Sequence, residues 1–143
     1  MSEHPTYPGD IPNSRGMIRP LALADAQPVQ MDGVKGVSMA VMLGRAHGMP
    51  HFAIRQFIVE PGGHSPHHSH DYEHEVYIVA GSGTVTLGGR EHPVRAGDVV
   101  YVPADEMHQF RASGKGPGNA PGGMTFLCMV PVDRNCGDPT PGS

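Results

Sequence analysis

The chain has few cysteines, no long apolar run and no excess of basic residues. Its two cysteines, Cys128 and Cys136, show no spacing typical of a disulfide framework, so we expect a reduced protein. No apolar stretch approaches the ~20 residues of a membrane-spanning helix. The net charge is −4 with acids and bases interspersed, which argues against nucleic acid as a partner. The first ten residues do not follow the pattern of a secretory signal, and we predict a cytoplasmic protein.

Glycine and proline, by contrast, are abundant. The 143 residues include 20 glycines and 15 prolines, and these separate short apolar runs without forming a repeat. Many short strands joined by turns are typical of an all-β sandwich or barrel. The expected strands span residues 37–43, 52–60, 75–79, 84–87, 91–95, 98–102, 108–112 and 124–130. Turns are predicted at residues 61–63 and 81–83, and no helix is expected.

The domain organisation follows from the same pattern. We expect an irregular N-terminal arm at residues 1–20, a barrel at 21–132 and a flexible tail at 133–143. Prolines rule out a long helix in the arm, which is either a disordered leader or an element that packs on a partner subunit. Because sheet edges invite pairing with another chain, we predict a homodimer.

Histidine is concentrated in one segment. The chain has 10 histidines, and five of them lie between His64 and His74. His68 and His70 are two residues apart, and on a strand such side chains share one face. Neutral imidazole is the most frequent protein ligand of divalent transition metals. The spacing therefore predicts a metal site.

Two longer patterns resemble the motifs of the cupin superfamily. The first is a glycine, five residues, His-x-His, three or four residues, Glu, six residues and Gly; Gly62, His68 and His70 match it. The second is a glycine, five residues, Pro-x-Gly, two residues, His, three residues and Asn, matched by Gly97, Pro103 and His108. The resemblance implies a jelly-roll barrel, the cupin double-stranded β-helix, with these three histidines as metal ligands.

The second motif is incomplete. Asp105 stands where the family has glycine, although aspartate tolerates the left-handed backbone conformation better than most residues. Ala112 stands where the family has asparagine.

The remaining ligand has two candidates. Four residues past His70 lies Glu75, the residue type that the family normally uses. Counting back from Gly81 reaches His74, and a histidine there resembles the four-histidine cupins associated with manganese. Strand parity does not decide between them, because both faces of the following strand are apolar. We favour His74 and keep Glu75 as the alternative.

Three further residues are candidates for the pocket around the metal. In related cupins an arginine, a phenylalanine and a cysteine line this pocket, and Arg55, Phe126 and Cys128 are the matching residues. Arg55 either clamps an anionic substrate or forms a structural salt bridge. Cys128 is expected to pack in the core, since no activating base is evident.

The predicted cofactor is one divalent transition metal. Resemblance favours Mn(II), and four nitrogen ligands also suit Fe(II), Cu(II), Ni(II) and Zn(II). Neutral imidazoles leave the metal its full charge, which favours an anionic small-molecule substrate. The expected function is a metal-dependent oxidoreductase, dioxygenase-like or peroxide-using. A Lewis-acid isomerase or lyase and a non-catalytic binding or sensor protein are the alternatives.

Overall fold

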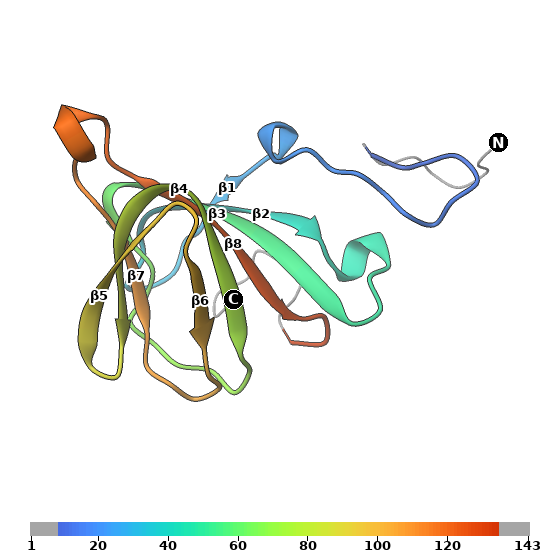
Figure 1. Cartoon of the computed structure of the whole chain (residues 1–143). Coiled ribbons are helices and arrows are strands. Elements are labelled where there is room, and N and C mark those ends of the chain that lie inside the picture. Colours follow the sequence, from blue (N-terminus) through green and yellow to red (C-terminus); the bar gives the residue numbers. More distant parts are fainter. Residues whose placement is uncertain (1–8, 135–143) are drawn as a thin grey trace.

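Strands make up nearly all the regular structure of residues 9–134, the part of the chain that the computed structural model describes. The eight strands are β1 (Gln27–Pro28), β2 (Lys35–Leu43), β3 (Phe52–His64), β4 (His74–Leu87), β5 (Arg90–Arg95), β6 (Val99–Val102), β7 (Gln109–Ala112) and β8 (Met124–Pro131). All their pairings are antiparallel, and they close into a barrel (Figure 1). The predicted all-β jelly-roll fold is confirmed.

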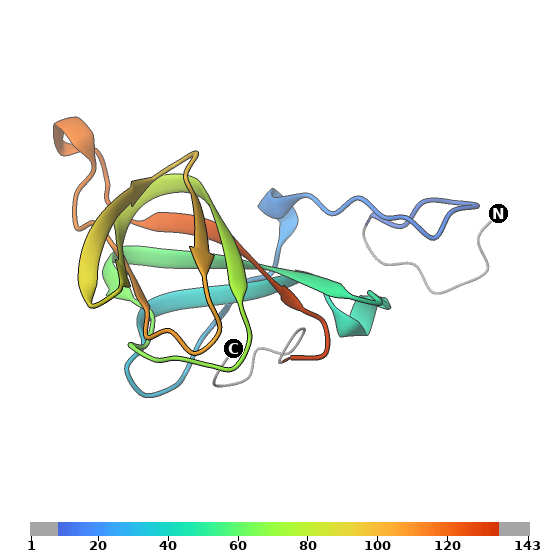
Figure 2. The ribbon, with the colours of Figure 1, turned by 60° about the horizontal axis from the view of Figure 1, so that its bottom comes forward.

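Two long strands hold the barrel together by passing from one sheet to the other. The first half of β4 pairs with β6 and β8, and its second half pairs with β5 and β7. In the same way β3 pairs with β2 and β8 along most of its length, and His64 near its end reaches β7. Figure 2 shows the curved walls that these strands form.

The turns predicted at residues 61–63 and 81–83 are therefore wrong, because both segments lie inside strands. At Gly81 the backbone has a φ of 80°, and a Cβ there would lie 2.1 Å from the Gly123 carbonyl oxygen. A Cβ on Gly83 would lie 2.0 Å from the Arg111 carbonyl oxygen. The glycines let β4 bend sharply and let a neighbouring backbone approach, which is what a barrel corner requires.

Side chains alternate between the interior and the outer face along each strand. On β8, Met124, Phe126, Cys128 and Val130 are buried, and the residues between them are partly exposed. The interior side chains form one hydrophobic core cluster that extends over both sheets. The candidate functional side chains lie at one place in the interior, where β3, β4 and β8 meet the segment between β3 and β4.

Between residues 9 and 134 the helical content is limited to three single turns of 3-10 helix, Leu21–Leu23, Arg45–His47 and Pro117–Asn119. Within the described residues no helix is long and apolar enough to cross a membrane. The strands run from Gln27 to Pro131, inside the predicted barrel limits. Residues 1–8 of the predicted arm and 135–143 of the predicted tail lie outside the described part.

The described part of the arm extends away from the barrel (Figure 1). It exposes 69% of Ile18 to solvent, and Leu23, just after the arm, is 75% exposed. The outer face of the barrel exposes large apolar side chains as well, including Phe52, Val99 and Tyr101. The homodimer stays a prediction, which these two surfaces support; light scattering that gives a monomer mass at micromolar concentration would overturn it.

Candidate metal centre

A histidine-rich loop, residues 65–73, connects β3 to β4 and lies across the open end of the barrel. His68 and His108 exchange two backbone hydrogen bonds, with N–O distances of 3.1 Å and 2.9 Å. The Asp105 N–H donates to the His70 carbonyl oxygen at 2.7 Å. The loop is thereby fastened to the segment before β7. The spacing of His68 and His70 predicted a regular strand, but both residues lie in the loop. Only an isolated β-bridge from His68 to His108 replaces the strand pairing.

Asp105 adopts the backbone conformation that its place in the motif requires. Its φ is 68°, in the left-handed region. Aspartate is one of the few residues other than glycine that enters this region at modest energetic cost. The substitution at this position is thus compatible with the turn that presents His108.

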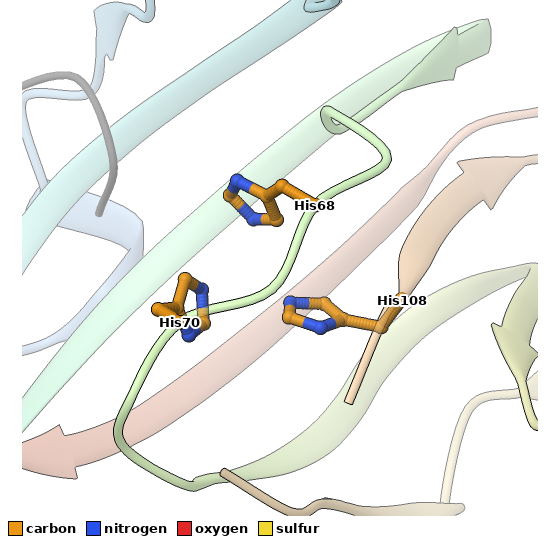
Figure 3. A group of neighbouring side chains, drawn as sticks. All are labelled: His68, His70 and His108. Atoms are coloured by element: carbon orange, nitrogen blue, oxygen red, sulfur yellow. The ribbon is translucent and has the colours of Figure 1, made fainter. Parts of the chain in front are cut away.

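The imidazoles of His68, His70 and His108 come together at this junction. Each offers one nitrogen, and these nitrogens all lie within 4.8 Å of one another. Figure 3 shows the three rings gathered between the histidine loop and the backbone that carries His108. Opposed nitrogens of one ion with 2.0–2.1 Å bonds are about 4 Å apart, so small side-chain rotations suffice to bind a metal.

His74, the first residue of β4, lies beside this group with its ring stacked on that of His70, but it is not one of the three histidines whose nitrogens all approach within 4.8 Å. It is 5% exposed, and its Nε2 lies 3.1 Å from both ring nitrogens of His70. Its Nδ1 lies 2.9 Å from the Cys128 sulfur, so an Nδ1–H can donate to Cys128 while Nε2 faces the cluster. Glu75, the alternative, is exposed on the outer face beside Glu73, and a hydrogen bond with Glu73 raises the pKa of Glu75.

The hydrogen bonding of the His108 ring suits a metal ligand. Its Nδ1 lies 2.8 Å from the Glu106 carbonyl oxygen, which fixes the proton on that nitrogen. Its Nε2 is buried and has no hydrogen-bond partner. An orphaned buried acceptor is energetically costly. A metal-ligating histidine has its ring N–H held by a hydrogen bond to an acceptor such as a carbonyl oxygen, and a free lone pair on its other nitrogen.

Burial also keeps the cluster neutral. Desolvation and, to a smaller extent, the nearby His108 together lower the pKa of His68 and of His70 to about 4. Desolvation and His70 lower the pKa of His74 to about 2. The pKa of His108 is lowered too, chiefly by burial. All four imidazoles are therefore neutral near pH 7, so no second ring proton competes with a metal for the free nitrogen.

These shifts predict that acid destabilises the metal-free protein well before its carboxylates titrate. A histidine with a folded pKa below its unfolded value of about 6.5 takes up a proton only on unfolding. Stability is thus retained above pH 6.5 and lost as pH falls toward 4. We expect the Tm of metal-free protein to drop by more than ~5 °C between pH 7.5 and pH 5. Calorimetry should show a shallower fall for His74→Ala; equal slopes would contradict the assignment.

A small cavity of about 40 Å³ opens beside the cluster. Its lining includes His68, His74, His108, Arg55 and Cys128, and none of its lining residues carries a carboxylate. The rest of the lining is mostly apolar. Phe126 stacks between Phe57 and Phe110, with ring centroids 5.2 Å and 4.8 Å apart.

Arg55 is fully buried in this cavity wall, with 0% exposed surface. Its terminal nitrogen Nη2 donates to the Cys128 sulfur at 3.3 Å, and its guanidinium carbon lies 5.2 Å from the Phe57 ring centre. Its Nε and Nη1 have no hydrogen-bond partner. No carboxylate among the described residues forms a salt bridge with it, so the structure of this part of the chain does not support the structural salt bridge considered from the sequence. Burial raises the pKa of Cys128, whose thiol therefore leaves the positive charge uncompensated.

Sequence reasoning missed one wall of the cavity. Val29, Met31 and Val34, which precede β2, line it together with the histidines. Two valines that flank a turn-forming Asp-Gly pair were a local signal of a turn. Nothing local indicated that this turn reaches the histidine loop.

Comparison with known proteins agrees with the fold and the site described above. A model of the cupin domain matches residues 55–120. The oxalate-binding protein of Thermotoga maritima is 33% identical over 88 residues, which cover 59% of this chain and 72% of that protein. The chain belongs to the cupin superfamily. The predicted resemblance is thereby confirmed at this level.

Other cupins resemble the chain as well. The 1-methylthio-D-xylulose 5-phosphate methylsulfurylase of Rhodospirillum rubrum is 38% identical over 82 residues, or 57% of this chain and 49% of that enzyme. The chain spans about half the length, or less, of several curated relatives that it matches. Among solved cupin structures, the polyketide cyclase RemF from Streptomyces resistomycificus has a TM-score of 0.69 and 29% identity, covering 81% of this chain and 80% of that one.

Proposed function

We propose that this cupin is a metal-dependent enzyme that binds a small organic anion and uses a four-histidine divalent metal as a Lewis acid. His68, His70, His74 and His108 would hold the metal, with Mn(II) the first candidate. The observation that carries the proposal is the fully buried Arg55, whose Nε and Nη1 lack partners in a cavity without carboxylates. A buried unpaired cation is costly, and an anionic ligand removes that cost.

The chemistry follows from the charges around the cavity. When bound, the metal would polarise a carbonyl or carboxylate oxygen of the substrate and stabilise negative charge that develops on it. Arg55 would donate hydrogen bonds to a second oxygen and orient the substrate. The stacked phenylalanines would exclude water from the apolar side of the substrate, which strengthens both electrostatic interactions.

The names of the relatives are compatible with a Lewis-acid role and do not fix the reaction. One is named a methylsulfurylase, another a polyketide cyclase, and a third an oxalate-binding protein. Carbon–oxygen substrates that carry or develop negative charge are common to the last two names. The oxidoreductase expected from the sequence stays a prediction, and so does the non-catalytic binding protein.

One experiment separates these alternatives. Mn(II)-loaded protein is incubated with pyruvate in deuterium oxide, and two signals are followed: deuterium entering the methyl group, by NMR, and oxygen consumption. Lewis-acid activation predicts exchange without oxygen uptake, and an oxidoreductase predicts uptake. If neither occurs and the anion still alters the Mn(II) resonance spectrum, the binding protein is favoured. No effect of pyruvate, acetate or glyoxylate on any signal would sink the proposal of an anion site.

A further inference from the structure

The turn at residues 31–34 closes one side of the cavity. It lies between β1 and β2, and its base is held by a hydrogen bond of 2.9 Å from the Val29 N–H to the Val37 carbonyl oxygen. Within the turn, the Val34 N–H donates to the Met31 carbonyl oxygen at 3.3 Å, and Gly33 has a φ of 83°. The turn is therefore a defined structure attached at its two ends.

Its side chains point toward the same space as the histidines. Val29, Met31, Val34 and Val37 line the cavity together with His68, His74 and His108. The tip of the turn packs against the histidine loop, since a Cβ on Gly33 would lie 3.6 Å from Pro66. Among the described residues, no hydrogen bond joins residues 30–34 to that loop. The closure is thus made by apolar contact alone.

The size of the cavity beside the turn limits what it can hold. Its volume of about 40 Å³ compares with ~10–15 Å³ for a single water-sized site. The pockets of drug-sized ligands are roughly 300–1,000 Å³. With the turn in place, the cavity therefore has room for only a few atoms beyond the metal site.

We propose that the turn at residues 31–34 is a lid, and that Met31 and Val34 restrict the ligand to a small anion of no more than about six non-hydrogen atoms. This inference rests on the proposed function, because the anion is the one that Arg55 and the metal would bind. It adds a substrate size class and two specificity-determining residues. A ligand as large as a benzoate requires the turn to move.

The test compares acetate and benzoate as probes of the Mn(II)-loaded protein, by calorimetry. The unchanged protein should bind acetate and bind benzoate at least ~10-fold more weakly. Met31→Ala with Val34→Ala should raise benzoate affinity ~10-fold and leave acetate affinity within about twofold, since truncating these two partly buried side chains opens space. Val99→Ala, on the outer face, is the matched control and should change neither.

The outcomes distinguish the two proposals. If acetate binds the unchanged protein and the benzoate-to-acetate ratio is the same in the variants, the lid is wrong and the anion site stands. If acetate fails to bind the unchanged Mn(II)-loaded protein, the anion site itself is wrong. Thermal melts of the variants in the presence of Mn(II) show that the barrel remains folded.

Discussion

Replacing His74 with alanine is expected to lower the affinity for Mn(II) ~100-fold, about 3 kcal/mol, whereas Glu75→Ala leaves it within about twofold. The reason is the direction of the two side chains. His74 is buried with its Nε2 3.1 Å from His70, and Glu75 is exposed on the outer face. Equilibrium dialysis against Mn(II), with metal analysis of the retained fraction, measures both variants.

The matched pair makes the result decisive. The two residues are adjacent on β4, so both variants test the same strand, and only one loses an imidazole from the cluster. A loss of Mn(II) in Glu75→Ala with full retention in His74→Ala would replace the four-histidine site by one with a carboxylate. His108→Ala serves as the positive control, because its buried Nε2 has no other partner. Circular dichroism of the metal-free variants shows whether the barrel still forms.

Much of this site could be predicted because its residues lie in short sequence motifs. The spacing of His68 and His70 and the later His108 follow from two such motifs, and the structure brings these three together. The sequence left His74 and Glu75 open, because both faces of β4 carry apolar residues. Tertiary structure distinguishes the two faces. Val76, on the same face as His74, is buried in the core at 0% exposure, whereas Tyr77, on the same face as Glu75, is 41% exposed on the outside of the barrel.

The errors share a physical origin. A glycine-rich segment has the same local preference whether the chain reverses in a turn or bends between two sheets. The choice at Gly81 depends on the backbone of Gly123, which is remote in sequence. The lid was missed for the same reason, because the contact of Gly33 with Pro66 joins two segments that are separated by two strands. Local sequence patterns predicted the candidate metal ligands, whereas long-range contacts determine which residues line the cavity.

The proposed anion site and the proposed lid both depend on the anion that Arg55 would bind. A metal held by the histidines would be a second positive centre beside the guanidinium, and no residue that lines the cavity supplies a carboxylate to balance the two. Stability alone would favour an apolar side chain at this position, because a buried unpaired charge destabilises a fold. Function and stability should therefore respond in opposite directions when Arg55 is changed, and a merely structural residue would not show that split.

Arg55→Met is accordingly expected to stabilise the metal-free protein and to weaken anion binding. Methionine retains much of the side-chain volume without the charge, so we expect the Tm to rise by a few degrees, equivalent to about 1 kcal/mol or more. Acetate affinity of the Mn(II)-loaded protein should fall ~10- to 100-fold, since a charged hydrogen bond contributes about 1.5–3 kcal/mol. Mn(II) affinity should stay within a few-fold, because Arg55 contacts Cys128 and Phe57 and donates to no histidine in the described structure. Arg55→Lys, which keeps the charge, should retain part of the acetate affinity. A lower Tm with unchanged acetate binding would show that Arg55 is structural, and the anion site would have to be abandoned.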